Sequence, residues 1–297
     1  MSAHAGDHGV AAMILAAGLG TRLRPLTDEL PKPLVPVGDA PMLAHIARWL
    51  RAAGSQRLVA NAHHHAAALA QVATDLGVHV SVEARILGTA GGVAAARSWL
   101  GGGEVVVWNG DILAPVDVRA LLAARRTTGS LAAWAVAPRA RGEGTVGIDE
   151  RGFVVRVRGF RSGVEVRGGD FLGISALAAA VVSGLPDEGC LVGDVLGPAI
   201  GRGERVIAVD HEGPWDDVGT PAAYLSANLR WLREAGRVSF GAPADLGEVE
   251  LDRVVLGAGA RVTGHGALRR VVVWPGAEAV APLEDAIVTP SRVVRAG

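Results

Sequence analysis

The fold is decided by the stretch Leu15-Ala16-Ala17-Gly18-Leu19-Gly20-Thr21-Arg22-Leu23-Arg24-Pro25-Leu26-Thr27 together with Pro31-Lys32-Pro33-Leu34-Val35-Pro36-Val37. An apolar run over residues 10–15 leads directly into Gly18 and Gly20. Glycines let the backbone approach a phosphate, and successive N–H groups can bind an anion. The spacing matches neither the P-loop nor the dinucleotide-binding pattern. The glycines alone therefore fit either a phosphate-binding loop of another kind or a plain strand-to-loop turn at the end of a buried strand.

The charged residues of this stretch suit phosphate binding. Thr21 offers a hydroxyl and Arg22 a charged fork, and Lys32 lies between two prolines that restrict its backbone. The chain has 28 Arg but only one Lys, and only three Asn. This bias indicates that Arg is used wherever either base serves. Lys32 is therefore a candidate for a position that needs a compact ammonium, although chance alone can also leave one Lys.

Outward from this stretch, strand-like and helix-like segments alternate. We expect strands at residues 10–15, 58–61, 78–82, 105–108 and 131–136, with helices at 41–53, 66–76, 93–100 and 118–126. Apolar strands that alternate with helices are typical of a parallel sheet covered on both faces. Ligands of such sheets bind beyond the carboxyl ends of the strands. The residues after Leu15 and after Trp108 are therefore the first candidates for a site.

The pattern changes near residue 145. Residues 145–148 and 153–158 predict a hairpin, followed by a strand at 171–174, a helix at 175–182, a strand at 205–209 and a helix at 221–232. After Gly236, short Val-rich pieces separated by Gly-Ala turns resemble the rungs of a left-handed β-helix, with an irregular β-tail as the alternative. So short a segment needs to pack on the main domain or on another subunit. We expect a loose tail at 1–9, a main domain at 10–236 and a β-helix-like segment at 237–297.

Four further motifs follow in order: Gly88-Thr89-Ala90-Gly91-Gly92, Asn109-Gly110-Asp111, Phe171-Leu172-Gly173-Ile174-Ser175 and Trp215-Asp216-Asp217-Val218-Gly219-Thr220-Pro221. With the opening stretch, they resemble the motifs of the sugar-1-phosphate nucleotidyltransferases, also called nucleotide-sugar pyrophosphorylases. The resemblance runs from about residue 10 to residue 232. It implies an α/β fold with a Rossmann-like mixed, mainly parallel sheet. It also implies an enzyme that makes a nucleotide-sugar and pyrophosphate from a nucleoside triphosphate and a sugar-1-phosphate.

The resemblance also implies roles for particular residues. Arg22 would bind the departing pyrophosphate, Lys32 the phosphates near the α-phosphorus, and Asp111 and Asp217 a Mg²⁺ ion. The nucleotide would contact the opening stretch and the Gly88 motif, at Leu15, Ala16, Ala17, Gly18, Gly20, Thr21, Gly88 and Thr89. Asn109, Gly144 and Gly173 are assigned to the sugar. Taken from the residues alone, Asn109-Gly110-Asp111 also fits a solvated turn, and Asp217 also fits a helix cap.

One motif of many relatives is missing. Where they carry Glu-Lys-Pro after the hairpin, this chain has Val154-Val155-Arg156-Val157-Arg158-Gly159, and Arg156 or Arg158 would have to replace the lysine. The chain is in this respect nearest the relatives with short sugar-binding domains, such as mannose-1-phosphate or heptose-1-phosphate guanylyltransferases and the N-acetylmuramate-1-phosphate uridylyltransferase. We favour GTP and a mannose-like phosphate.

Composition excludes several other classes of protein. A formal net charge of −1 over 297 residues argues against nucleic acid as a partner, and a mean hydropathy of +0.30 comes without an apolar stretch long enough to span a membrane. The single cysteine, Cys190, cannot form an intrachain disulfide. No secretory signal is evident in the sequence, so we expect a cytoplasmic protein. Self-association through the C-terminal segment is kept as a hypothesis.

Three other functions stay open. The first is a UTP-dependent enzyme acting on an amino-sugar phosphate. The second is a catalytically silent subunit that senses nucleotide-sugars, although the chain retains Lys32, Asp111 and Asp217. The third is a transferase for phosphocholine or another small phosphate, which would need an aromatic cage built from the seven Trp, four Phe and one Tyr.

Overall fold

The computed structural model describes residues 10–237, 239–241 and 248–296. The expected loose tail at 1–9 lies outside the described residues. The described chain forms two compact units. Unit 1 contains the chain up to Gly18 and Leu43–Trp215, and unit 2 contains Leu19–Met42 and the chain from Asp216 onward. The expected division of the chain near residue 236 stays a prediction.

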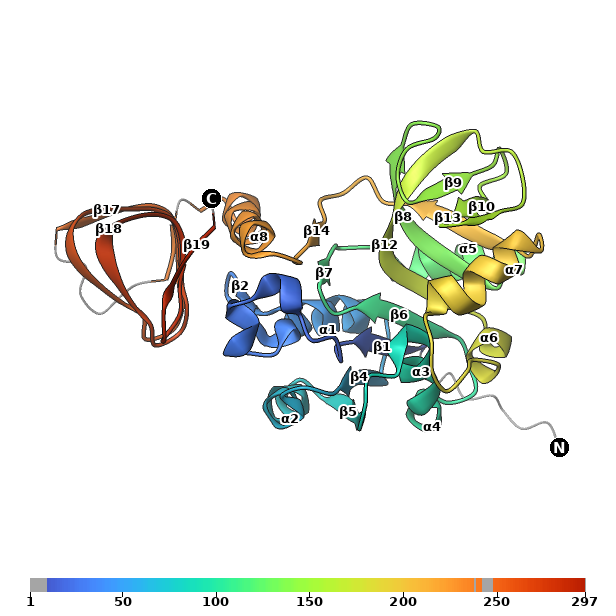
Figure 1. The fold of residues 1–297 in the computed structure, drawn as a ribbon, viewed down its shortest axis with the longest axis horizontal. Helices are drawn as coiled ribbons and strands as arrows, with labels where there is room; N and C mark the ends of the chain where they lie inside the picture. Colours follow the sequence, from blue (N-terminus) through green and yellow to red (C-terminus); the bar gives the residue numbers. More distant parts are fainter. Residues whose placement is uncertain (1–9, 238, 242–247, 297) are drawn as a thin grey trace. The chain divides into compact units, whose positions relative to one another are not determined.

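The centre of unit 1 is a parallel sheet whose inner strands are buried and mainly apolar. Strand β1 (Ala11–Leu15) lies between β6 (Val105–Asn109) and β4 (Leu58–Ala62), and β5 (Val78–Val82) lies beyond β4 (Figure 1). All three of these pairings are parallel. Both faces of β1 are covered, which explains why its side chains are all apolar. The predicted strands therefore exist, and their carboxyl ends lie at one edge.

The other half of the sheet is mainly antiparallel. The long strand β12 (Arg167–Leu177) pairs antiparallel with β6, with β8 (Ala132–Arg139) and with β9 (Val146–Ile148). Strand β9 forms the expected hairpin with β10 (Val154–Val157). Two further strands complete the sheet of ten: β11 (Phe160–Arg161), antiparallel to β10, and β13 (Val206–Asp210), parallel to β8. The sheet is thus mixed, as expected for a Rossmann-like fold of this kind.

Helices connect these strands. They are α1 (Met42–Ala52, which enters unit 1 at Leu43), α2 (Ala66–Asp75), α3 (Gly88–Ala95), α4 (Arg97–Leu100), α5 (Val118–Thr128), α6 (Ala179–Ser183), the π-helix η4 (Leu191–Leu196) and α7 (Gly197–Gly201), with the short strand β7 (Ile112–Leu113) before α5. Helix α5 has residues at both ends that are typical of helix boundaries. The Asp117 side chain accepts N–H bonds from Arg119 and Ala120 at its start, and Gly129 ends it with a left-handed φ of 60°.

One predicted helix is wrong and the start of another differs. The helix expected at 175–182 is mostly strand, because β12 continues to Leu177 and α6 covers only Ala179–Ser183. Residues 175–177 pair with β6 on one side and β8 on the other, so a central place in the sheet overrides their helical pattern. The helix expected at 93–100 begins earlier, because α3 already starts at Gly88.

Unit 2 consists of residues 19–42 and the C-terminal part of the chain. After Leu19 the chain forms three short 3-10 turns and a two-stranded ribbon: η1 (Thr21–Leu23), η2 (Leu26–Asp28), η3 (Lys32–Leu34), β2 (Pro36–Val37) and β3 (Ala40–Pro41). The short strand β14 (Asp216–Asp217) precedes helix α8 (Pro221–Glu234), which Thr220 caps by accepting the N–H of Ala223.

Two buried polar side chains of α8 form hydrogen bonds to the backbone of the proline-rich segment, residues 31–41. The Asn228 Oδ1 accepts the N–H of Gly38 at 2.9 Å, and the Tyr224 hydroxyl donates to the carbonyl of Pro36. The same hydroxyl accepts the indole N–H of Trp274 at 3.0 Å. Burial raises the pKa of Tyr224 above its usual value. Tyr224 therefore stays a neutral donor that links the proline segment, α8 and the C-terminal strands.

The C-terminal strands form a parallel coil, in agreement with the expected β-helix-like segment. They are β15 (Ser239–Phe240), β16 (Val249–Leu256), β17 (Arg261–Val273), β18 (Glu278–Val288) and β19 (Val293–Arg295). The first four pair in parallel order, and β19 returns antiparallel to β18. Figure 1 shows β17 and β18 winding around a common interior with a triangular outline. Leucines 251, 268 and 283 are aligned across three successive strands.

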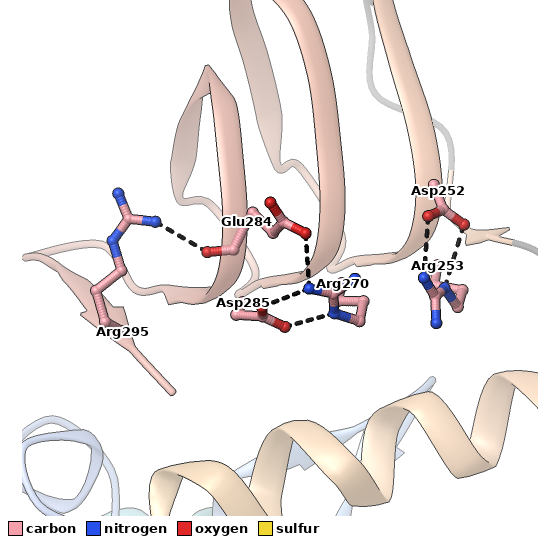
Figure 2. Close-up of polar contacts among 6 residues, drawn as sticks. All are labelled: Asp252, Arg253, Arg270, Glu284, Asp285 and Arg295. Carbon is pink, nitrogen blue, oxygen red and sulfur yellow. Dashed lines mark hydrogen bonds and ion pairs between the residues drawn. The ribbon is translucent and has the colours of Figure 1, made fainter. Parts of the chain in front are cut away.

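One corner of this coil is made by charged residues in the left-handed backbone region. Arg253, Arg270 and Asp285 have φ values of 56°, 53° and 48°, and the aligned residues on either side place them on successive strands at the same corner. Figure 2 shows Arg270 donating to Asp285 and Glu284, whereas Arg253 pairs with its own neighbour Asp252. A non-glycine residue in this region costs roughly 1–2 kcal/mol. The ion pairs at this corner partly offset that cost.

Substitution of Arg253 tests the strain at this corner. We expect Arg253→Val to lower the free energy of unfolding by about 1–2 kcal/mol, because a β-branched side chain is least compatible with a left-handed φ. Arg253→Gly removes the same ion pair without the backbone cost and serves as the matched control. Urea unfolding followed by circular dichroism would measure both. Equal stability of the two variants would contradict the strain.

Candidate functional site

The two loops selected from the sequence meet at the carboxyl edge of the parallel sheet. Leu15, the last residue of β1, is aligned with Asn109, the last residue of β6. The Leu15 carbonyl accepts the N–H of Gly110 at 2.9 Å. The structure therefore places Leu15 and the turn that carries Asp111 side by side. Ala16, Ala17 and Gly18 follow directly on the same edge.

Asn109 and Gly173, both assigned to the sugar, lie in contact. Gly173 has a φ of 72° at an irregularity of β12, and a Cβ atom there would lie 2.3 Å from the Asn109 Nδ2. Only glycine allows this approach, because any side chain would displace the amide. Gly144 lies elsewhere in unit 1, in the loop between β8 and β9, where a Cβ atom would lie 2.3 Å from the Gly169 carbonyl oxygen.

The loop that carries Gly144 is held by a buried ion pair. The Arg156 Nε donates to the Glu165 Oε2 at 2.5 Å, and its two other nitrogens donate to the carbonyls of Glu143, Gly144 and Val146. Glu165 also accepts the N–H of Gly142 at 2.6 Å. All nitrogens of the Arg156 guanidinium are thereby engaged within the protein, which leaves Arg158, an exposed residue, as the candidate to replace the missing lysine.

This ion pair predicts an acid-dependent loss of stability. The Arg156 guanidinium beside Glu165 holds the pKa of that carboxyl below its usual range, against the opposing effect of burial. A lowered carboxyl pKa stabilises the fold above the unfolded value of about 4.3, and the contribution is lost as pH falls through the folded value. We expect the melting temperature of Glu165→Gln to fall less steeply than that of the wild type between pH 5 and pH 3. Parallel curves would contradict the assignment.

Gly88 and Thr89, at the start of the Gly88 motif assigned to the nucleotide, form the first turn of helix α3. The Thr89 Oγ1 accepts the N–H of Leu191 at 2.7 Å. A Cβ atom on Gly88 would lie 2.4 Å from the Gly189 carbonyl oxygen, and one on Gly91 would lie 2.6 Å from that of Asp187. The glycines therefore let α3 pack closely against residues 187–191.

Sequence reasoning missed two buried polar residues beside this helix, Asn61 and Glu83, which are 3% and 4% exposed. Asn61 is the last residue of the strand predicted at 58–61, and Glu83 directly follows β5. The rule that singled out the ends of β1 and β6 applies equally to these two strands. The scarcity of Asn was a second signal, since Asn61, Asn109 and Asn228 all make specific contacts in the structure.

Within unit 2 the structure brings Gly20 and Lys32 together. Gly20 has a φ of 61° and precedes η1, and its carbonyl accepts the hydroxyl of Thr27 at 2.9 Å. A Cβ atom on Gly20 would lie 3.3 Å from the Lys32 Cβ. Thr21 begins the turn that carries Arg22. The tight turns η1–η3 thus gather the polar residues of the opening stretch into one short segment.

The side chains of Arg22 and Asp217 both lie near Gly219 in unit 2. A Cβ atom on Gly219 would lie 3.1 Å from the Asp217 Oδ1 and 3.2 Å from an Arg22 Nη atom. The neighbouring Asp216 is paired with Arg230 at 3.0 Å, and burial raises the pKa of Asp216. Of the two aspartates in the motif, Asp217 is therefore the one whose side chain lies, like that of Arg22, beside Gly219.

Carboxylate oxygens are the donors that a magnesium site requires. Asp111 belongs to unit 1 and Asp217 to unit 2. Across residues 10–237, 239–241 and 248–296, no three His, Cys, Asp or Glu side chains group as a metal site. Mg²⁺ usually takes only one or two carboxylates and completes its shell with phosphates and waters. The carboxylate of Asp111 and that of Asp217 are each a donor of the kind that Mg²⁺ takes.

Comparison with known proteins identifies the family. The model of the nucleotidyl transferase family matches residues 11–161, which include β1, the loop after it and β6. The chain belongs to the nucleotidyl transferase family. Among the described residues of this nucleotidyl transferase, no helix is long and apolar enough to cross a membrane.

Curated relatives of this nucleotidyl transferase act on different sugar phosphates. It is 36% identical over 120 residues to a mannose-1-phosphate guanylyltransferase of Mycobacterium tuberculosis, covering 39% of this chain and 33% of the relative. It is 30% identical over 244 residues to a mannose-1-phosphate guanyltransferase of Schizosaccharomyces pombe, covering 74% and 64%. It is 42% identical over 119 residues to an N-acetylmuramate α-1-phosphate uridylyltransferase of Neisseria meningitidis, covering 37% and 50%. The matches thus span from a third to just under two-thirds of these relatives.

A solved structure supports the fold. The crystal structure of HddC from Yersinia pseudotuberculosis, complexed with GMP-PN, superposes with a TM-score of 0.63 at 23% identity, covering 75% of this nucleotidyl transferase and all of HddC. The mixed sheet of unit 1 is therefore the Rossmann-like nucleotidyl transferase fold.

Proposed function

We propose that this protein transfers a nucleotidyl group from a nucleoside triphosphate to a sugar-1-phosphate and releases pyrophosphate. The observation that supports it most is the adjacency of the glycine loop and the Asp111 turn at the carboxyl edge of β1 and β6. This edge is where α/β sheets bind nucleotides. A sugar-phosphate oxygen attacks the α-phosphorus in line, and the protein contributes positioning and charge neutralisation.

The chain's own residues take distinct parts in this reaction. The nucleotide lies against Leu15, Ala17 and Gly18, together with the first turn of α3 at Gly88 and Thr89. Ala16, Gly20 and Thr21 shape the same loop. Asn109, Gly144 and Gly173 border the sugar, with Arg158 as the cation for its phosphate.

Arg22 and Lys32 neutralise the phosphates. Arg22 presents a planar fork suited to the departing pyrophosphate, and Lys32 a point charge suited to oxygens that move during the reaction. Lys32 starts the 3-10 turn η3, and the preceding Pro31 fixes its entry. Both residues lie in the short segment ordered by Gly20 and Thr27, so their positions are set by one set of local hydrogen bonds.

Asp111 and Asp217 are the proposed ligands of Mg²⁺. A bound Mg²⁺ would supply positive charge to the phosphate oxygens and hold them in place. The chain's part is to present carboxylates while the substrate phosphates complete the coordination. Asp216 does not share this role, because it is paired with Arg230.

For the substrates, we propose GTP and a mannose-1-phosphate-like sugar. Two of the relatives above are mannose-1-phosphate guanylyl- or guanyltransferases, and one of these matches extends over 74% of the chain. UTP with an amino-sugar phosphate is the second candidate, because the uridylyltransferase of Neisseria meningitidis is 42% identical over the matched 119 residues.

A grid of reactions tests the function. Pyrophosphate release is measured with Mg²⁺ for four nucleoside triphosphates against mannose-, glucose-, N-acetylglucosamine- and N-acetylmuramate-1-phosphate, with reactions lacking sugar phosphate as the control. We expect the strongest release with GTP and mannose-1-phosphate. Release only with UTP would move the assignment to the second candidate. A blank grid from folded protein that binds nucleotide-sugars would contradict catalysis and favour the sensing subunit.

A further inference from the structure

The buried pair Asn61 and Glu83 has no part in the reaction described above, yet each oxygen and nitrogen atom of the two side chains has a hydrogen-bond partner. Asn61 lies on β4 and Glu83 directly after β5. The Asn61 Nδ2 donates to the Glu83 Oε1 at 2.7 Å. A buried carboxylate is costly unless its hydrogen bonds are satisfied, so its presence in the core of unit 1 requires an explanation.

The pair connects the two segments proposed to contact the nucleotide. The Asn61 Oδ1 accepts the N–H of Ala16, in the loop after β1, at 2.7 Å. At the other end, the Glu83 Oε2 accepts the N–H of Leu87, the residue before α3, at 3.1 Å. Three hydrogen bonds therefore run without a break from the glycine loop to the first turn of α3.

Close packing and backbone hydrogen bonds surround this series of hydrogen bonds. A Cβ atom on Gly92 would lie 2.6 Å from the Asn61 Nδ2 and 2.9 Å from the Glu83 Oε1, so α3 packs directly on the pair. The backbone of Glu83 is fixed as well, since its N–H donates to the Ala62 carbonyl at 2.7 Å and its carbonyl lies 3.0 Å from the His63 Nδ1. The second glycine of the Gly91-Gly92 pair is thus explained by the packing on Asn61 and Glu83.

We propose that Asn61 and Glu83 are positioning residues that set the separation between the glycine loop and the start of α3, and thereby the affinity for the nucleoside triphosphate. This rests on the proposed function, in which the nucleotide contacts both segments. The Ala16 N–H is used by Asn61, so phosphate binding falls to the N–H groups that follow it. Groups that bind a ligand from two segments must be held to within about 0.5 Å.

Exchanging the two functional groups tests the proposal. Asn61→Asp keeps the acceptor for Ala16 but sets a carboxylate against that of Glu83. Glu83→Gln leaves two N–H donors facing one oxygen and one NH₂ group, so one donor meets another. In the double variant Asn61→Asp/Glu83→Gln, the new amide donates to the new carboxylate and its oxygen accepts the N–H of Leu87. All three hydrogen bonds can then form again, and the negative charge lies at position 61 instead of position 83.

We expect each single variant to raise the KM for the nucleoside triphosphate about 10- to 100-fold, because binding must return the two displaced segments to their wild-type separation, at a cost comparable with that of one unsatisfied buried polar group. The kcat and the KM for the sugar phosphate should stay within about threefold, and the double variant should return to within about threefold of the wild type. Glu104→Gln is the matched control. It removes a carboxylate paired with Arg126 at the amino end of β6, away from this edge, and should leave all three constants unchanged.

Dissociation constants for the triphosphate, measured by calorimetry on the same proteins, separate this proposal from the proposed function. If the wild-type protein binds nucleotide without turnover, the proposed reaction is overturned. The dissociation constants of the variants then still test the positioning role of Asn61 and Glu83. Single variants with unchanged nucleotide affinity, or a double variant that merely multiplies the two defects, would overturn the positioning role. If a single variant does not fold, a folded double variant with wild-type affinity supports the proposal, and a folded one with weakened affinity contradicts it.

Discussion

Replacing Lys32 by Ala is expected to reduce kcat about 10²- to 10³-fold with little change in protein stability. The proposed role of Lys32 is to neutralise charge near the α-phosphorus, and loss of one preorganised donor in such a site costs about this much. Its side chain is half-buried at the start of η3, where the flanking prolines hold the backbone whatever the side chain. Single-turnover measurements with saturating substrates would separate the chemical step from binding.

Lys32→Arg is the informative companion to this variant. It keeps the charge but exchanges a compact ammonium for a broad planar fork, and we expect it to recover only part of the activity. Full recovery would mean that charge alone is needed at this position. Turnover of Lys32→Ala close to that of the wild type would contradict the assignment altogether.

The second large effect is expected for Asp111→Asn, with activity reduced at least 100-fold at a fixed Mg²⁺ concentration. Changes in residues that merely support a metal ligand already cost 10- to 100-fold, so loss of a ligand should cost no less. Raising the Mg²⁺ concentration should restore part of the activity, because the neutral amide weakens metal binding more than it alters shape.

Asp117→Asn is the control for Asp111. Asp117 follows on the same connection between β6 and α5, is exposed, and caps α5, a role that Asn fills equally well. It should leave both activity and the Mg²⁺ dependence unchanged. If Asp111→Asn lost activity with the same Mg²⁺ dependence as the wild type, Asp111 would have a role other than metal binding.

The sequence alone was enough to predict the parallel half of the sheet. Strands β1, β4 and β6 are short runs of mainly buried apolar residues, and β5, at the edge of the sheet, alternates valine with His79 and Ser81. The stretch after Phe171 behaved differently. Its last residues have helical character but pair on both sides within the sheet, and pairing with strands distant in sequence cannot be read from local periodicity.

Sequence rules selected the part of the candidate site that depends on strand ends and missed the part that depends on burial. The loop after Leu15 and the Asp111 turn follow from the rule for α/β sheets. Asn61 and Glu83 obey the same rule, but their importance comes from hydrogen bonds to Ala16 and Leu87, which only the folded chain brings within reach. The left-handed corner at Arg253 carries no glycine and so left no local signal.

The composition of the chain gives η3 a practical use. Lys32 is the only lysine in the 297 residues, so the protein has a single side-chain amine, and it lies in the segment proposed to bind phosphate. An amine-selective acylating reagent would therefore modify one side chain, and the extent of modification could be read by mass spectrometry. Protection by a bound nucleotide would make Lys32 an intrinsic reporter of occupancy without any engineered label.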